Sequence, residues 1–158
     1  MELKTRRVHF AGCTPQPGTD WMMQMAKNLT DCEDGFLNGK QYLLMDRDDK
    51  FSAAFRSILE HSGIESVRLP PRSPNLNSHL ERFMRSIGEE CLDRMIFFGE
   101  SSLWNGVGEF LTHYHGERNH QGLDNRIPLP GNEVGRSQGA IECRERLGGI
   151  LRYYHRAA

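Results

Sequence analysis

The sequence predicts an α/β fold. Short apolar runs that suit strands alternate along the chain with longer segments whose apolar residues recur at helical spacing. The chain has 158 residues, of which 37% are hydrophobic and 26% charged, a composition typical of one globular domain with a core. The formal net charge of -1 gives no general argument for binding nucleic acid or a membrane surface, so any basic surface must be local.

The composition also predicts a compartment. No apolar run reaches the roughly 20 residues that cross a bilayer, and the N-terminal residues do not have the order of a signal peptide. The four cysteines are scattered and form no CxxC pair, so we interpret them as reduced thiols. We therefore expect a cytoplasmic protein without a membrane partner.

Three segments are predicted as strands. Residues 2–13 alternate apolar and polar side chains. Residues 41–45, QYLLM, form a short apolar run between turn signals, which predicts a buried strand. Residues 64–70, IESVRLP, predict a short strand that Pro70 and Pro71 end.

Four helices are predicted from apolar residues that share one face. The first follows an N-cap at Thr19 or Asp20, and the second, SAAFRSILEHSG, ends at Gly63. The third runs from His79 to Arg94 and the fourth from Ser102 to His115. The residues expected to point inward are Trp21, Met25 and Leu29; Ala54, Phe55, Ile58 and Leu59; Leu80, Met84, Ile87 and Cys91; and Leu103, Val107, Phe110 and Tyr114.

The segment after Gly131 differs from the rest because it is rich in glycine and arginine. We predict a domain over residues 1–130 and a tail over residues 131–158. The tail is expected to hold a short helix near Ile141 to Leu147 or to be partly loose.

The stretch YLLMDRDDKF places Asp46 directly after an apolar run. A turn acid is one interpretation, because Asp favours turns, and a metal ligand at a strand end is the other. Glu81 lies on the third predicted helix, and the 34 residues 47–80 separate it from Asp46. By itself Glu81 could be a solvated helix acid paired with Arg85. Together the two carboxylates could meet at one rim of a sheet and hold Mg²⁺ or Mn²⁺ for phosphoryl transfer.

Three stretches of the chain resemble the catalytic core of integrases and insertion-sequence transposases, the retroviral-integrase-like domain with a DDE triad. They are LLMDRDDKF, LPPRSPNLNSHLERFMRSIGEECL and EFLTHYHGERNHQGLDNRIP. The resemblance covers most of residues 5–130 and implies an RNase H-like mixed sheet flanked by helices. Asp46 matches the second Asp of the triad and Glu81 matches its Glu. The family usually has Gly or a small residue where this chain has Asp48, so we interpret Asp48 and Asp49 as loop acids.

The first Asp of the triad has no counterpart in the sequence. The opening residues, MELKTRRVHFAGCT, resemble the end of the second strand and the third strand of the family. We therefore expect an N-terminally truncated core that lacks its first strand and is inactive alone. The resemblance implies that the intact protein performs DNA integration by Mg²⁺- or Mn²⁺-dependent strand transfer. The alternatives are a non-catalytic nucleic-acid-binding remnant of a transposase and a metal-dependent nuclease.

The resemblance implies that a basic loop and helix lie against DNA, and arginine suits the phosphate groups there. The residues expected to contact DNA are Arg72, Asn75, Asn77, His79, Arg82 and Arg85. For the arginines, a solvated charged face is the alternative. The resemblance implies transposon ends and target DNA as partners, and a homo-oligomer when the site is intact.

The remaining histidines offer a second metal site to weigh. His113 and His115 are two residues apart and do not share a helix face, so we interpret them and His120 as surface or hydrogen-bonded histidines. We interpret NHQGL, residues 119–123, as shaping the end of the last helix.

Overall fold

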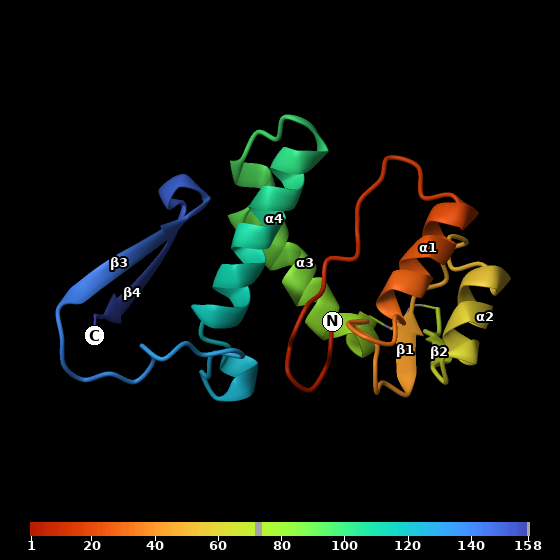
Figure 1. Cartoon of the computed structure of the whole chain (residues 1–158), viewed down its shortest axis with the longest axis horizontal. Helices are drawn as coiled ribbons and strands as arrows, with labels where there is room; N and C mark the ends of the chain where they lie inside the picture. The colour runs from red at the N-terminus through yellow and green to blue at the C-terminus, as the bar shows by residue number, and fades with distance from the viewer. Residues whose placement is uncertain (72–73, 158) are drawn as a thin grey trace. The chain divides into compact units, whose positions relative to one another are not determined.

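The computed structural model describes residues 1–71 and 74–157. The chain divides into two compact units, one of residues Met1–Val8 and His79–Ala158 and the other of His9–Ser78. Figure 1 colours the elements in chain order. The helices and strands are α1 (Thr19–Leu29), β1 (Tyr42–Met45), α2 (Ala53–His61), β2 (Glu65–Arg68), α3 (Ser78–Glu90), α4 (Gly99–Gly116), β3 (Ile141–Arg146) and β4 (Leu151–Arg156), with short 3-10 turns η1 (Pro74–Asn77), η2 (Leu92–Arg94), η3 (Gln121–Leu123) and η4 (Leu147–Gly149).

The unit His9–Ser78 is built around a β–α–β arrangement. Strands β1 and β2 run parallel, in a register from Tyr42 opposite Glu65 to Met45 opposite Arg68. Helix α2 connects them and packs on β2 and on α1 (Figure 1). The buried core residues of this unit are Met22, Ala26, Leu37, Met45, Phe55, Leu59 and Ile64.

Local signals fix both ends of α2. The Ser52 hydroxyl accepts a hydrogen bond from the Phe55 backbone N–H at 3.3 Å, which satisfies one free donor of the first turn. Gly63 has a φ of 76°, the left-handed conformation that ends many helices. The prediction for this helix is therefore confirmed, whereas α1 has Gly18 as its N-cap in place of Thr19 or Asp20.

Two strand predictions in the first half need correction. Residues 2–13 form no strand, because the chain turns back there: Arg6 has a φ of 61° and its N–H donates to the Glu2 carbonyl at 2.9 Å. Strand β1 forms as predicted but is buried on one side only. Tyr42 is 58% exposed and Leu44 43%, while Met45 is buried, because alternate side chains point to opposite faces.

Helices α3 and α4 make the core of the other unit. The Phe83 ring on α3 lies 6.2 Å from the Phe110 ring and 5.1 Å from the Tyr114 ring, both on α4. The predicted inward face of α3 was partly wrong. Phe83 and Ile87 are buried, whereas Met84 is 56% exposed. The stripe at four-residue spacing starts from Phe83, and Met84 lies next to it on the water side.

The C-terminal segment forms a hairpin, so the predicted helix near Ile141 to Leu147 is wrong. Strands β3 and β4 pair antiparallel, with Ile141 opposite Arg156 and Arg146 opposite Leu151. The η4 turn joins them, and β3 and η4 pack on α4. The sequence IECRER forms a strand because β4 pairs with it along its whole length. The division of the chain at residue 130 stays a prediction.

The structure is therefore mixed α/β, with two small sheets in the described ranges. Within those ranges, no helix combines the length and the apolar character needed to cross a membrane.

Candidate functional site

Asp46 lies directly after β1, at the carboxyl end of a parallel strand, and is exposed. Its Oδ1 accepts a hydrogen bond from the Asp48 backbone N–H at 3.2 Å, which makes a local turn. The Arg47 Nε donates to the Leu69 carbonyl at 3.0 Å, and the Leu69 N–H donates to the Met45 carbonyl at 2.9 Å. The ends of β1 and β2 are thus tied together, and Asp46 uses Oδ1 for the turn, while its role as a metal ligand stays a prediction.

The neighbouring acid Asp48 is occupied locally. The Lys50 Nζ donates to its Oδ2 at 2.8 Å, and the Lys50 N–H donates to its Oδ1 at 2.9 Å. The side-chain bond first and the backbone bond second lower the pKa of Asp48. These contacts support its interpretation as a loop acid.

Glu81 lies in the first turn of α3 and is exposed. A carboxylate suits this position, because the N-terminal end of a helix carries a partial positive charge. The ion pair with Arg85, which belongs to the alternative interpretation of Glu81, does not form in the described part of the chain. The exposure of Glu81 fits the alternative of a solvated helix acid, but the ion pair of that alternative is missing.

Asp46 and Glu81 belong to different units, each described by itself, so their pairing at one metal stays a prediction. Their chemistry fits a hard cation, because Mg²⁺ and Mn²⁺ prefer oxygen ligands. No group of three or more His, Cys, Asp or Glu that could hold a metal occurs within residues 1–71 and 74–157. Asp46 and Glu81 thus have the carboxylate oxygens that such a cation prefers, and their arrangement around one metal ion is not part of the described structure.

The residues expected to contact DNA are distributed over two elements. Arg72 lies outside the described residues. Asn75, exposed, and Asn77, half-buried, form part of η1. His79, Arg82 and Arg85 are all exposed on α3, so this helix brings three of the predicted residues together.

His79 and Arg82 also line a cavity of about 300 Å³. The other cationic side chains of its wall are Arg6, from the N-terminal turn, and Arg118, just after α4. His120 completes the ring of basic and imidazole groups, and Arg85 is not part of the lining. We refer to this cavity as the arginine pocket.

Hydrogen bonds order the arginine pocket. The Arg6 Nη2 donates to the His79 Nε2 at 3.0 Å. The His120 Nε2–H donates to the Tyr114 carbonyl at 2.8 Å, and the two rings meet edge to face at 4.5 Å. Arg118 pairs with Glu90, which lies outside the lining.

The electrostatics of the arginine pocket are positive. Burial lowers the pKa of His79, and the guanidinium groups of Arg6 and Arg82 lower it further. Burial also lowers the pKa of His120; the bond to Tyr114 opposes this, and Arg118 and Arg6 add to it. Sequence reasoning missed Arg6, Arg118 and His120 as a group, because more than 100 positions separate the first from the others. The signal in the sequence was the basic character of two short segments, residues 6–7 and 117–120.

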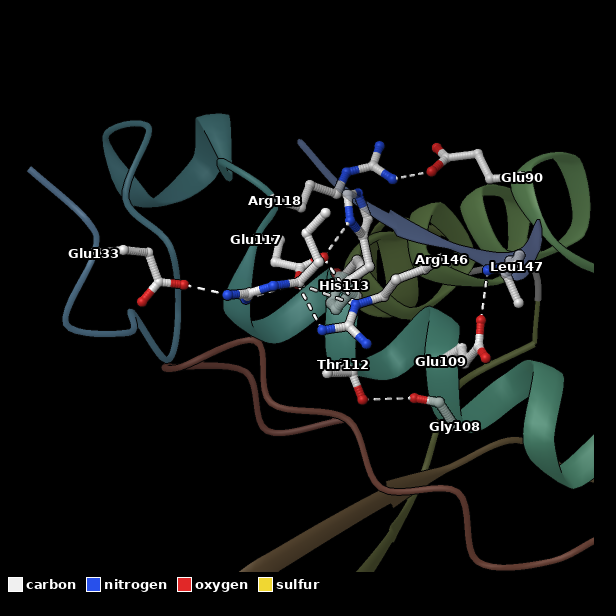
Figure 2. Close-up of polar contacts among 12 residues, drawn as sticks. Glu90, Gly108, Glu109, Thr112, His113, Glu117, Arg118, Glu133, Arg146 and Leu147 are labelled. Carbon is white, nitrogen blue, oxygen red and sulfur yellow. Dashed lines mark hydrogen bonds and ion pairs between the residues drawn. The ribbon is translucent and has the colours of Figure 1, made fainter. Parts of the chain in front are cut away.

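A buried carboxylate was also missed. Glu117, at the C-cap of α4, is 7% exposed and accepts hydrogen bonds from Arg146, Arg144 and His113 (Figure 2). Burial works to raise the pKa of Glu117, but the bonds from Arg146 and His113, and then from Arg144, hold it below its ordinary value. Glu117 therefore fixes the β3–β4 hairpin to α4.

The predicted role of the histidines as hydrogen-bonded groups is confirmed. His113 Nδ1 lies 3.0 Å from Glu117, and His115 Nε2 accepts from the Val8 N–H at 2.9 Å. His120 is held by Tyr114, as described above. Each of these rings has a structural partner in its own unit.

Comparison with protein families gives a match. Residues 62–128 match the family described as Integrase core domain. No curated protein and no solved structure gave a match. Residues 62–128 therefore resemble an integrase core domain, and they include α3 and α4. At the level of the family, this description suggests DNA integration and transposition.

Proposed function

We propose that the protein acts on DNA as part of a DDE-type integrase core, a polynucleotidyl transferase with an RNase H-like fold. The observation that carries the proposal is the integrase-core match over residues 62–128, which contain Glu81 and the basic face of α3. The parallel β1–α2–β2 arrangement supports it, because a strand-end acid on such a sheet is a common place for a catalytic group.

In this proposal Asp46 and Glu81 are the metal ligands of the chain. The family-like spacing of 34 intervening residues supports this assignment, as does the exposure of both carboxylates. Mg²⁺ or Mn²⁺ held there would stabilise the charge on phosphoryl oxygens during attack by a DNA 3′-hydroxyl. The protein residues contribute ligands and position, and no covalent enzyme intermediate is needed.

A DDE site needs a further Asp, and none of residues 1–158 matches it in the family pattern. We propose that these residues alone do not catalyse strand transfer and that they still bind DNA. His79, Arg82 and Arg85 on α3, together with Asn75 and Asn77, supply the contacts in this proposal. Arg72 is proposed on sequence grounds. The intact enzyme acts as a homo-oligomer in the nucleoid.

The second candidate is a non-catalytic DNA-binding remnant, which the arginine pocket favours because a cationic surface binds a backbone without any metal. Under this alternative, DNA affinity in Mg²⁺ survives Asp46→Asn and Glu81→Gln unchanged. Under the first proposal, both variants weaken the Mg²⁺-dependent part of DNA binding.

The experiment is a joining and nicking assay on labelled DNA with Mn²⁺, combined with measured DNA affinity. The chain is compared with Glu81→Gln and with Glu89→Gln, an exposed acid on the same helix. We expect DNA binding and no joined product. Joining that disappears only in Glu81→Gln would show a complete site and overturn the proposed inactivity. Cleavage without joining would identify a nuclease, and the absence of DNA binding at low salt would reject both proposals.

A further inference from the structure

We propose that the arginine pocket binds a phosphate group, and that a phosphate of the DNA backbone occupies it when the protein binds DNA. The proposal rests on the proposed DNA-binding function for the source of the phosphate. It goes beyond that function by adding a defined subsite that includes Arg6 and Arg118.

The first argument is charge. Arg6, Arg82 and Arg118 line the pocket, and none of the lining residues that the structure describes carries a carboxylate. Glu90 contacts Arg118 from outside the lining, so it orients one guanidinium group without occupying the pocket. An anion is the ligand that this excess positive charge favours.

The second argument is the kind of donor. Guanidinium groups present forked N–H donors that match the oxygens of a phosphate group. The wall also includes the amides Asn119 and Gln121, which can donate to phosphate or sugar oxygens without adding charge. Three cations together with neutral donors suit a phosphodiester, which carries one charge and several oxygen acceptors.

The third argument is order. Arg6 is held by His79, and His120 by Tyr114, so two walls of the pocket are fixed before a ligand arrives. Groups that are already positioned lose less conformational entropy when a ligand binds. The cavity of about 300 Å³ lies at the small end of ligand sites, with room for a phosphodiester and its neighbouring sugar atoms.

The fourth argument is access. Arg82 and His79 lie on the exposed side of α3, beside the proposed DNA contact Arg85. A backbone that follows this helix can therefore place one phosphate in the pocket while its neighbours contact the outer face. Arg6 and Arg118 would then extend the DNA contact from α3 to the N-terminal turn and to the end of α4.

The test compares Arg6→Gln and Arg82→Gln with Arg126→Gln. Arg126 belongs to the same unit, and its side chain is 79% exposed outside the pocket. Arg118 is left intact, because its removal would leave Glu90 without this partner. DNA affinity of the full chain is measured for a random-sequence duplex over a range of NaCl concentrations. Thermal unfolding checks that the three variants remain folded.

We expect both pocket variants to weaken binding several-fold. Each should also reduce the salt slope by about 0.9 for every phosphate group that the variant no longer neutralises. The control is expected to keep the slope of the unchanged chain. If the pocket variants have the same DNA affinity and salt slope as Arg126→Gln, the proposal that a DNA phosphate occupies the pocket is overturned.

A second arm uses inorganic phosphate at constant ionic strength, with chloride as comparison, and follows the ring NMR signals of His79 and His120. If phosphate shifts these signals although the pocket variants keep the salt slope of DNA binding of the unchanged chain, the pocket binds the phosphate group of a free molecule. The proposal that a DNA phosphate occupies it is then wrong. If neither arm responds, the pocket is not a phosphate site. If the unchanged chain binds no DNA, the proposed function fails, and the phosphate arm alone decides whether the pocket binds an anion.

Discussion

Arg146 binds Glu117 through two nitrogen atoms, with Nη2 at 2.6 Å from Oε1 and Nε at 2.9 Å from Oε2. The bond joins β3 to the C-terminal end of α4, across 29 positions of sequence. Because Glu117 is buried, this contact ties the last hairpin to the helix pair more firmly than a surface ion pair would.

The first prediction concerns this contact. Replacing Glu117 by Gln leaves Arg146 without its carboxylate and Arg144 with Glu133 alone, so we expect a decrease of about 3 kcal/mol in the free energy of unfolding. Urea unfolding measures the decrease, and limited proteolysis tests whether residues 131–158 become accessible. Glu145→Gln, in the exposed pair with Arg152, is the control and should cost less than about 1 kcal/mol. Equal costs would contradict the anchoring role.

The second prediction is a pH dependence. The pKa of Glu117 in the folded protein lies below its ordinary value of 4.5. The folded state therefore binds a proton at this group less readily than the unfolded state does. The stabilisation is fully present above pH 4.5 and is lost as the pH falls through the lower folded value. Unfolding free energies from pH 7 to pH 3 should fall less steeply in Glu117→Gln than in the unchanged chain. Parallel curves would show that this carboxylate does not contribute.

The third prediction tests the buried face of α3. Phe83→Ala should lower the free energy of unfolding by about 3–5 kcal/mol, because it opens a cavity beside Phe110 and Tyr114. Met84→Ala, one residue on, should change it by less than about 1 kcal/mol, because Met84 is exposed. Chemical denaturation measures both. A larger cost at Met84 would support the inward face first expected from the sequence.

The fourth prediction addresses the proposed metal ligands without an activity assay. Mn²⁺ should broaden the NMR signals of residues around Asp46 and Glu81, and EDTA should restore them. Asp46→Asn and Glu81→Gln should each weaken this broadening, because a carboxylate oxygen ligand is removed. Asp49→Asn, a neighbouring loop acid, should leave it unchanged. Broadening that persists in both ligand variants would place the metal elsewhere.

The predictable parts of the fold were those with local causes. Helix α2 has a serine cap at one end and a left-handed glycine at the other, and both are visible in the sequence. The strand at Glu65–Arg68 was also found, because a proline pair marks its end. The integrase resemblance was found from the loop-helix pattern around Glu81 and is confirmed over residues 62–128.

The errors came from non-local causes. Alternation in residues 2–13 suggested a strand, but a strand needs a partner, and the turn at Arg6 removes that segment from extended structure. IECRER could be placed as a strand only with its hairpin partner in view. The arginine pocket draws on residues from both ends of one unit, so no window of sequence could reveal it.

The bond from Arg6 to His79 spans 73 positions, and the bond from Val8 to His115 spans 107. The unit that contains them is discontinuous in sequence, whereas residues His9–Ser78 form a continuous unit. During synthesis on the ribosome, the continuous unit can close as soon as it emerges. The first eight residues must wait for the polypeptide up to residue 122, since long-range contacts carry a loop-closure cost. The arginine pocket can therefore form only after the whole of the continuous unit has been synthesised.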